Sequence, residues 1–182
     1  MKQYKYETYE QYKKIQIGRR NLKLNKNKSI DIYKNHLEYV LENFNTKNEI
    51  KSIICHGVRN ENEVNCFKKI FPKAEIFGTE IGFENKGKNI WKCDFSKLPS
   101  DWEKKFDLTY SNSIDHCYDI DKTLQEWKRT TKKYMLILFH FGNPTSTDPF
   151  RIENLNDVIK LADEHALETI WNKKSLFLFK IL

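Results

Sequence analysis

The sequence predicts an α/β fold: a mostly parallel β-sheet with helices on both faces and an antiparallel hairpin at its C-terminal end. Five short apolar runs between residues 52 and 141 are typical of buried strands, and segments with helical periodicity or turn residues separate them. Two further apolar runs, at 167–171 and 175–182, are joined only by Asn172, Lys173 and Lys174, which is the length of a hairpin turn. One domain is expected from a chain of 182 residues.

The first strand is the apolar run before Gly57, which introduces a tight turn. The helix after this turn is expected to begin at a cap, Asn60 or Asn62, because asparagine side chains accept from free backbone N–H groups. Pro72 should stop this helix near residue 70, since proline cannot continue a helix.

A second strand at 74–81 carries Glu80 near its end, 23 residues after Gly57. A turn that brings backbone N–H groups to a ligand, followed about 20 residues later by a carboxylate that accepts from a ribose diol, is the nucleoside-binding half of a doubly wound fold. Only Gly57 is present where three glycines are expected, so this pattern alone is a weak signal.

The remaining elements follow at the spacing of an α/β domain: strands at 90–93, 106–111 and 134–141, and helices at 121–131 and 153–164. The strand at 134–141 is apolar throughout, as expected of a central strand that is covered on both faces. Because ligands in open α/β sheets bind beyond the carboxyl ends of the strands, Gly57, Glu80, Asp94 and Asn112 are expected to share one site.

Residues 1–29 form a basic, tyrosine-rich arm, and residues 30–182 are expected to form the single domain. Tyr6, Tyr9 and Tyr12 have the three-residue spacing of one helical face. This face either packs on the main body or forms a lid over a substrate pocket. We expect a solvated loop at 19–28, and a helix from Ser29 or Asp31 to residue 45.

Composition narrows the functional classes. The net charge of +7 and pI near 9.1 are compatible with an anionic partner. Arginine, which suits bidentate phosphate contacts, is scarce, so nucleic-acid binding is possible but not favoured. No long apolar run or signal peptide is present, and we expect a cytoplasmic protein without a membrane partner. No Cys-x-x-Cys pair occurs, so no metal site is expected.

A set of short phrases runs along nearly the whole chain: Tyr9-Glu-Gln-Tyr12 with Ile15-Gln16, Ile54-Cys-His-Gly57, Gly78-Thr-Glu-Ile81, Asp94-Phe95, Tyr110-Ser-Asn-Ser-Ile-Asp-His116, Tyr118-Asp119, Glu126-Trp127 and Asp148-Pro-Phe150. On these phrases and the closing hairpin, the sequence resembles class I S-adenosylmethionine-dependent methyltransferases. Within that class it is similar to a group of small, methyltransferase type 11-like proteins. The resemblance implies a doubly wound, Rossmann-like methyltransferase sheet and S-adenosyl-L-methionine as the cofactor.

The resemblance also implies roles for ten residues. The loop around the methionine end of the cofactor would be His56, Gly57, Val58 and Arg59. Glu80, with Ile81 beside it, would bind the ribose hydroxyls, and Asp94 and Phe95 would meet the adenine. Ser111 and Asn112 would face the sulfonium. The chain departs from the family pattern where Arg59 and Glu61 replace later glycines of the first loop, and His56 could equally be a packing residue.

Asp115, His116 and His140 are the candidates for catalysis, because they lie at or just past the ends of adjacent strands. Methyl transfer to oxygen or nitrogen needs alignment and the removal of one proton, and a histidine suits that removal. An equal alternative is that Asp115 caps a turn and His116 only packs against the cofactor.

The leading hypothesis is a methyltransferase that acts on an oxygen or nitrogen of a small molecule or sugar. RNA methylation is one alternative, which the basic charge supports. A catalytically inactive, S-adenosylmethionine-binding regulatory protein is another, which the missing glycines allow.

Overall fold

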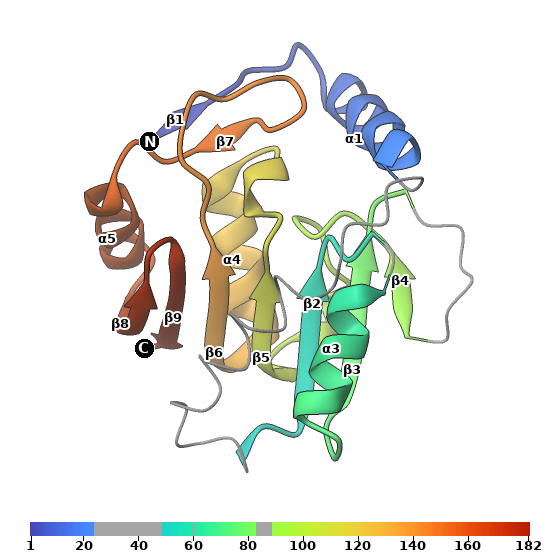
Figure 1. The fold of residues 1–182 in the computed structure, drawn as a ribbon, viewed down its shortest axis with the longest axis vertical. Coiled ribbons are helices and arrows are strands. Elements are labelled where there is room, and N and C mark those ends of the chain that lie inside the picture. Colours follow the sequence, from blue (N-terminus) through green and yellow to red (C-terminus); the bar gives the residue numbers. More distant parts are fainter. Residues whose placement is uncertain (24–48, 60, 83–88) are drawn as a thin grey trace.

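The computed structural model describes residues 1–23, 49–59, 61–82 and 89–182 (Figure 1). The helix expected from Ser29 or Asp31 to residue 45 lies outside these residues. In the described part of the chain, no helix is both long enough and apolar enough to cross a membrane.

The main sheet has seven strands in the order β4-β3-β2-β5-β6-β9-β8. Its strands are β2 (Ser52–His56), β3 (Glu75–Glu80), β4 (Ile90–Lys92), β5 (Phe106–Ser111), β6 (Thr131–Leu138), β8 (Leu167–Lys173) and β9 (Leu176–Ile181). The five strands β4, β3, β2, β5 and β6 are parallel to one another, and β9 lies antiparallel between β6 and β8. This confirms the predicted mostly parallel sheet with its C-terminal antiparallel hairpin. The chain runs outward from β2 to β4 and then returns to β5, so the topological switch point lies between β2 and β5.

Each face of the sheet has its own core, because alternate residues of a strand point to opposite faces. Ile53 of β2 belongs to a cluster with Phe67 of the helix α3, whereas Ile54 belongs to a second cluster with Trp127 of α4. Helices α3 (Asn62–Ile70) and α4 (Ile120–Thr130) therefore cover opposite faces of the sheet, as Figure 1 shows.

Helix starts follow local capping only in part. Asp119 caps α4, since its side chain accepts from the backbone N–H of Lys122. Asn154 caps α5 (Leu155–Glu164) in the same way. The expected cap of α3 at Asn60 or Asn62 was wrong: Glu61 precedes the helix in a left-handed conformation and makes no side-chain capping bond.

The C-terminal hairpin turns more tightly than predicted. Lys173 of β8 pairs with Leu176 of β9, so only Lys174 and Ser175 connect the strands. Lys174 adopts φ 55°, the left-handed conformation that short hairpin turns require. Four consecutive residues of β9, from Leu176 to Phe179, are buried, as expected for a strand covered on both faces.

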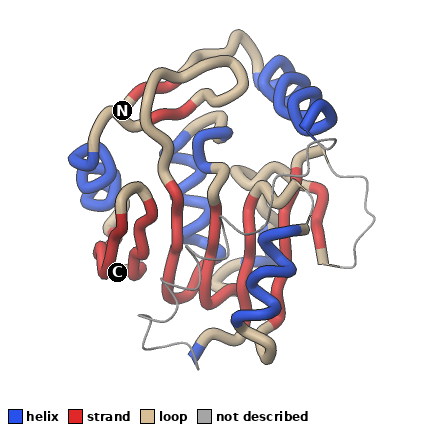
Figure 2. The backbone as a smooth tube through the Cα atoms, in the orientation of Figure 1, coloured by secondary structure: helices blue, strands red, loops and turns tan. Residues whose placement is uncertain are grey.

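The N-terminal arm lies across the carboxyl ends of the parallel strands (Figures 1 and 2). Strand β1 (Lys2–Gln3) pairs antiparallel with β7 (Phe150–Arg151), and α1 (Tyr9–Lys23) follows it. The predicted loop at 19–28 was wrong for its first part, because residues 19–23 belong to α1. The described residues also form the 3₁₀ helices η2 (Ser100–Trp102), at the predicted turn around Trp102, and η3 (Ile114–His116), directly after β5.

Candidate functional site

A partly open cavity lies between α1 and the carboxyl ends of the strands, and its volume of about 490 Å³ includes open solvent. The strand ends and their loops contribute seven residues that the sequence predicted as site residues: Gly57, Arg59, Glu80, Ile81, Asp94, Phe95 and His116. Four further residues were not predicted: Tyr12, Gln16, Arg19 and Ser113. Elements far apart in the sequence thus converge at the topological switch point, where open α/β sheets bind ligands.

Gly57 allows two loops to meet at the floor of this cavity. It adopts φ 75°, and a Cβ atom there would lie 2.6 Å from the Cβ of Ser113. Its N–H donates to the carbonyl of Thr79 over 2.9 Å, which ties the turn after β2 to the end of β3. Both the backbone conformation and the close approach therefore require glycine at this position.

Glu80 presents a carboxylate that backbone groups hold in place. It is 7% exposed, and its Oε2 accepts from the N–H of Arg59 over 3.0 Å. Its Oε1 accepts from the N–H of Gly82 over 3.3 Å. A carboxylate offers about four acceptor positions, which suits a ligand that presents a pair of hydroxyls.

Asp94 joins the loop after β4 to α1. Its Oδ1 accepts from the backbone N–H of Ser96 over 2.7 Å, and its Oδ2 accepts from the hydroxyl of Tyr9 over 2.6 Å. The ammonium of Lys97 lies 4.6 Å from the centre of the Tyr9 ring. Burial raises the pKa of Tyr9, and the hydrogen bond to Asp94 raises it further, so this hydroxyl stays a donor.

His116 sits on η3 and is held from two sides. Buried Ile114 anchors η3, and the backbone N–H of His116 donates to the carbonyl of Ser113 over 3.0 Å. The ring atom Nδ1 lies 2.8 Å from the carbonyl oxygen of Thr147 and 3.1 Å from Nη1 of Arg19. A carbonyl only accepts and a guanidinium only donates, so the shorter contact assigns the proton to Nδ1 and the lone pair to Nε2.

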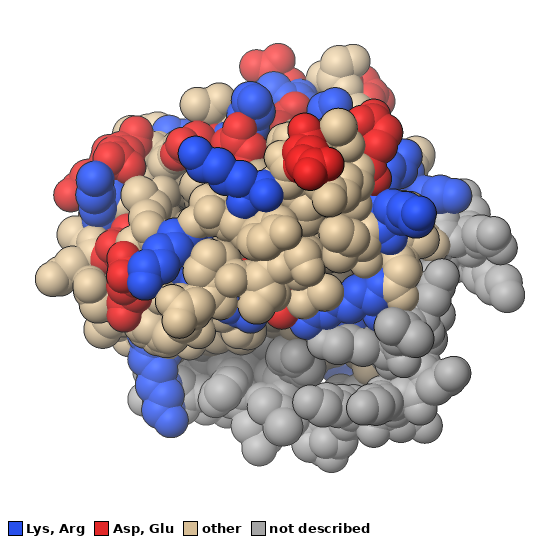
Figure 3. All heavy atoms as spheres, turned by 90° about the horizontal axis from the view of Figure 1, so that it is seen from above, with Lys and Arg blue, Asp and Glu red and all other residues tan. Residues whose placement is uncertain are grey.

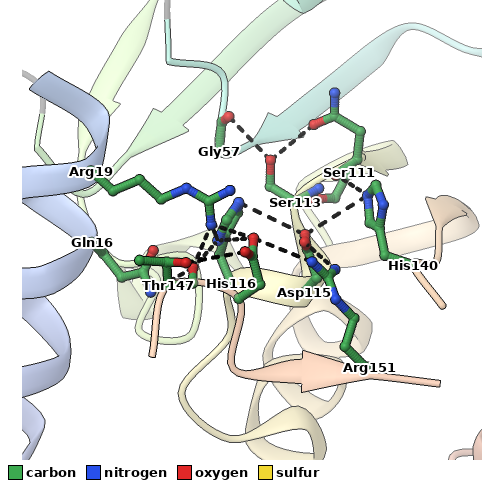
Figure 4. A network of polar contacts seen from close by, with 12 residues as sticks. Gln16, Arg19, Gly57, Ser111, Ser113, Asp115, His116, His140, Thr147 and Arg151 are labelled. Carbon is green, nitrogen blue, oxygen red and sulfur yellow. Dashed lines mark hydrogen bonds and ion pairs between the residues drawn. The ribbon is translucent and has the colours of Figure 1, made fainter. Parts of the chain in front are cut away.

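Two arginine side chains and two carboxylates surround this imidazole (Figure 4). Arg19 reaches from α1 to the carboxylate of Asp148 and to the carbonyl of Thr147, and Arg151 donates to Asp115 Oδ2 over 2.5 Å. The two guanidinium and two carboxylate charges balance, and burial lowers the pKa of His116 below its usual 6.5. The imidazole is therefore neutral at physiological pH and can accept a proton at Nε2.

Asp115 lies behind His116 rather than on the cavity wall. Its Oδ1 is buried and has no hydrogen-bond partner among the described residues. Two ring nitrogens approach it, Nε2 of His116 at 3.9 Å and Nε2 of His140 at 3.8 Å. A proton gained by His116 at Nε2 would therefore find a carboxylate oxygen close by.

His56 is a buried packing residue. Its ring stacks on Trp127 with centroids 4.9 Å apart, and Nδ1 lies 2.8 Å from the hydroxyl oxygen of Thr79. Burial lowers its pKa to about 3, so the ring is uncharged. This arrangement is the packing alternative that the sequence left open.

Four further predicted site residues lie beside the cavity without lining it. Val58 is fully buried in the core under α3, and the hydroxyl of Ser111 donates to the carbonyl of His56. Asn112 donates to Oε1 of Glu63 over 3.3 Å. His140 donates from Nε2 to the carbonyl of Asn112 over 3.0 Å, and this contact fixes the segment after β5.

The unpredicted cavity residues come mainly from α1. Tyr12, Gln16 and Arg19 follow one another at spacings of four and three residues, so they share one face of that helix. The Tyr12 hydroxyl donates to the carbonyl of His116 over 3.0 Å, and the Gln16 amide donates to that of Thr147. The predicted tyrosine face continued through Gln16 and Arg19, and extending it by two turns would have found both.

Asp115, His116 and Asp148 also have the spacing of a metal-ligand set, with candidate ligand atoms within 4.8 Å of one another. Both carboxylates, however, already pair with guanidinium groups of Arg19 and Arg151. Charge-assisted pairs of this kind satisfy the carboxylates, so the set carries no metal assignment.

No family model and no curated protein matches the sequence. Solved structures do match the fold. The 1,6-didemethyltoxoflavin-N1-methyltransferase of Burkholderia thailandensis, with bound 1,6-didemethyltoxoflavin and S-adenosylhomocysteine, gives a TM-score of 0.72 at 8% identity, over 97% of this chain and 91% of that chain. A sugar N-methyltransferase from Streptoalloteichus gives 0.64 at 10% identity, over 88% and 91%. An Aquifex aeolicus methyltransferase gives 0.59 at 15% identity, over 79% and 87%. The chain therefore has the Rossmann-like fold of class I S-adenosylmethionine-dependent methyltransferases, as predicted.

Proposed function

We propose that the cavity binds S-adenosylmethionine and that the protein transfers a methyl group to an oxygen or nitrogen of a small molecule or sugar. The observation that carries this proposal is the Glu80 carboxylate, which two backbone N–H groups hold at the cavity wall. A carboxylate at this strand end suits a ribose diol.

The residues present fit this cofactor at three points. Gly57 keeps the floor free of a side chain, and Glu80 would accept from the ribose hydroxyls. Asp94 and Phe95 lie on the wall formed by the loop after β4, where a carboxylate and a backbone N–H would meet the adenine. Ser111 and Asn112 would support the loop beside the sulfonium rather than contact it, because neither lines the cavity.

When bound, S-adenosylmethionine supplies an electrophilic methyl group. The chain must then hold the acceptor in line and take up one proton from its oxygen or nitrogen. We assign the proton to His116, a neutral residue that lines the cavity, with Nε2 as the accepting atom. Asp115, with Oδ1 at 3.9 Å, would stabilise the resulting imidazolium. His140 is the second candidate base, although its Nε2 already donates to a carbonyl.

A small acceptor is favoured over a macromolecule for two reasons. Tyr12, Gln16 and Arg19 of α1 line the cavity on the side opposite the strand ends, which favours a compact acceptor. Two proteins with the same fold are named as methyltransferases of a small heterocycle and of a sugar. Hydrogen-bonding side chains on α1 would suit a polar acceptor of this size.

Isothermal titration calorimetry with S-adenosylmethionine and S-adenosylhomocysteine tests the proposal. Glu80→Ala should weaken binding by about 1.5–3 kcal/mol, the range for a hydrogen bond to a charged group. Glu75→Ala is the matched control, because Glu75 is exposed at the opposite end of the same strand. A wild-type protein that binds neither compound, or that binds NAD equally well, would contradict the assignment.

A further inference from the structure

Two residues of the loop between β2 and α3 adopt a backbone conformation that disfavours side chains. Arg59 has φ 33° and Glu61 has φ 64°, both in the left-handed region. These are the positions at which the family pattern has glycine. Strained backbone of this kind persists where the surrounding structure or a function maintains it. Of the two residues, Arg59 lines the cavity and Glu61 does not.

The guanidinium of Arg59 differs from the other described arginine side chains. Arg19, Arg129 and Arg151 each form an ion pair with a carboxylate. Within residues 1–19, 49–59, 61–82 and 89–182, by contrast, no carboxylate lies within ion-pair distance of the Arg59 side chain. Among these described residues, its positive charge therefore has no carboxylate in direct contact, and Arg59 acts on the buried Glu63 carboxyl only over a longer distance.

The backbone of Arg59 fixes where this charge lies relative to the rest of the site. The Arg59 N–H donates to Glu80 Oε2 over 3.0 Å, so the side chain starts beside the carboxylate that we assign to the ribose. Gly57, at the cavity floor, is two residues away. A ligand whose ribose meets Glu80 would thus extend its next polar group into reach of the guanidinium.

We infer that Arg59 binds the carboxylate at the amino-acid end of the cofactor and makes the site selective for ligands that carry it. This inference rests on the proposed function. S-adenosylmethionine has one carboxylate, and a guanidinium fork can bind a carboxylate through two parallel N–H···O bonds. Where a glycine would offer only its backbone, this chain supplies a charged side chain in addition to the backbone N–H.

The test compares S-adenosylmethionine with its decarboxylated analogue, because the two differ only in that carboxylate. Calorimetry on the wild type should show a preference for the carboxylated ligand of at least about tenfold. Arg59→Gly should weaken S-adenosylmethionine binding by about 10- to 100-fold and change the affinity for the decarboxylated analogue by less than about threefold. The glycine keeps the backbone N–H that donates to Glu80, so the nucleoside contacts should survive.

Glu61→Gly is the matched control, since it also places glycine at a left-handed position. Both glycine variants should raise the melting temperature of the ligand-free protein, because each relieves backbone strain. Only Arg59→Gly should lose the preference for the carboxylate. Arg59→Lys keeps the charge without the fork and should retain an intermediate preference, which supplies a second variant if the glycine form folds poorly.

The outcomes separate this inference from the proposed function. In one outcome, the wild type binds S-adenosylmethionine, and the Arg59→Gly and Arg59→Lys variants prefer S-adenosylmethionine over the decarboxylated analogue as strongly as the wild type does. This result would overturn the inference about Arg59 and leave the proposed function standing. Equal losses for both ligands would also overturn it, since they would show a general disturbance of the loop. A wild type that binds neither ligand would overturn both.

Discussion

The imidazole of His116 shows how single residues set the chemistry of this site. Nδ1–H is engaged by the carbonyl of Thr147, and the charges of Arg19 and Asp148 cancel beside it. Burial is the main cause that lowers its pKa. His116 lines the cavity, and a neutral imidazole there can act as a general base toward a bound acceptor.

Replacing His116 should therefore affect turnover more than cofactor binding. His116→Ala is expected to lower kcat by roughly 10²–10⁴-fold while the Kd of S-adenosylhomocysteine stays nearly unchanged. Because its pKa is lowered, wild-type activity should persist as pH falls below 6.5, and the acidic limb of the pH profile should disappear in the variant. The assay requires an acceptor, found by screening small metabolites and sugars with labelled cofactor.

His140→Ala tests the second candidate base, and it should lower kcat less than His116→Ala because His140 does not line the cavity. Asp115→Asn should cost less than His116→Ala, because it removes a charge that stabilises the imidazolium and not the base itself. A His116→Ala enzyme with wild-type kcat and an unchanged pH profile would exclude His116 as the base and point to His140.

At the scale of elements, the sequence predicted those whose burial follows from their own residues. The apolar runs of β2, β5 and β6 identified buried strands, and the alternation of large apolar residues identified β9. The sequence predicted a doubly wound sheet, and the structure shows the order of its parallel strands, β4-β3-β2-β5-β6. Strand ends were also predictable, and with them the positions of Gly57, Glu80 and Asp94.

What could not be predicted depends on contacts between distant segments. The face of α1 that closes the cavity is polar, so no hydrophobic periodicity reveals its partner. Its contacts run from Tyr9 to Asp94 and from Arg19 to Asp148, more than 80 residues away. Likewise, the left-handed Glu61 before α3 follows from the tight loop that carries Arg59 and not from a capping signal.

The placement of α1 leads to a prediction about residues 1–29, which we propose as a lid. Lys13 and Lys14 are exposed on α1, so trypsin cleavage there reports local opening of the helix. A ligand that binds only the closed form should slow cleavage by at least about tenfold when its concentration is about 100 times its Kd. Equal cleavage rates with and without S-adenosylhomocysteine would show that α1 is packed independently of the ligand.

Tyr9→Phe should weaken this closure without ligand, because it removes the 2.6 Å bond to Asp94 and keeps the aromatic ring. Cleavage at Lys13 and Lys14 should then become about tenfold faster, the usual cost of a hydrogen bond to a charged group. Tyr4→Phe is the control, since the ring of Tyr4 packs on Tyr6 and lies outside the cavity wall.

At the scale of the whole molecule, the net charge of +7 does not come from a single cluster of positive side chains on the face that Figure 3 shows. Figure 3 shows lysine and arginine side chains interspersed there with aspartate and glutamate. Nucleic-acid binding depends on clustered positive charge along a surface. The visible face therefore gives the RNA alternative no support beyond the composition.

Two buried groups, His56 and Glu63, make the free energy of unfolding depend on pH in opposite directions. Burial lowers the pKa of His56 to about 3, below 6.5 in the unfolded chain, so its contribution is lost as pH falls from 6.5. Burial raises the pKa of Glu63 from 4.5 to about 7, so the folded state binds more protons and its stability falls as pH rises through that range. Between pH 4.5 and 6.5 the two slopes oppose each other.

The Glu63→Gln variant should separate the pH dependence due to Glu63 from that due to His56. The variant removes the cost of a buried carboxylate whose Oε2 has no partner among the described residues, while the amide oxygen can still accept from Asn112. Relative to wild type, its free energy of unfolding should be similar near pH 4.5 and greater by about 3 kcal/mol at pH 8, since each pKa unit corresponds to about 1.4 kcal/mol. Urea unfolding across this range measures the difference, with Glu75→Gln at an exposed position as control. A constant difference at all pH values would mean that Glu63 does not titrate in this range.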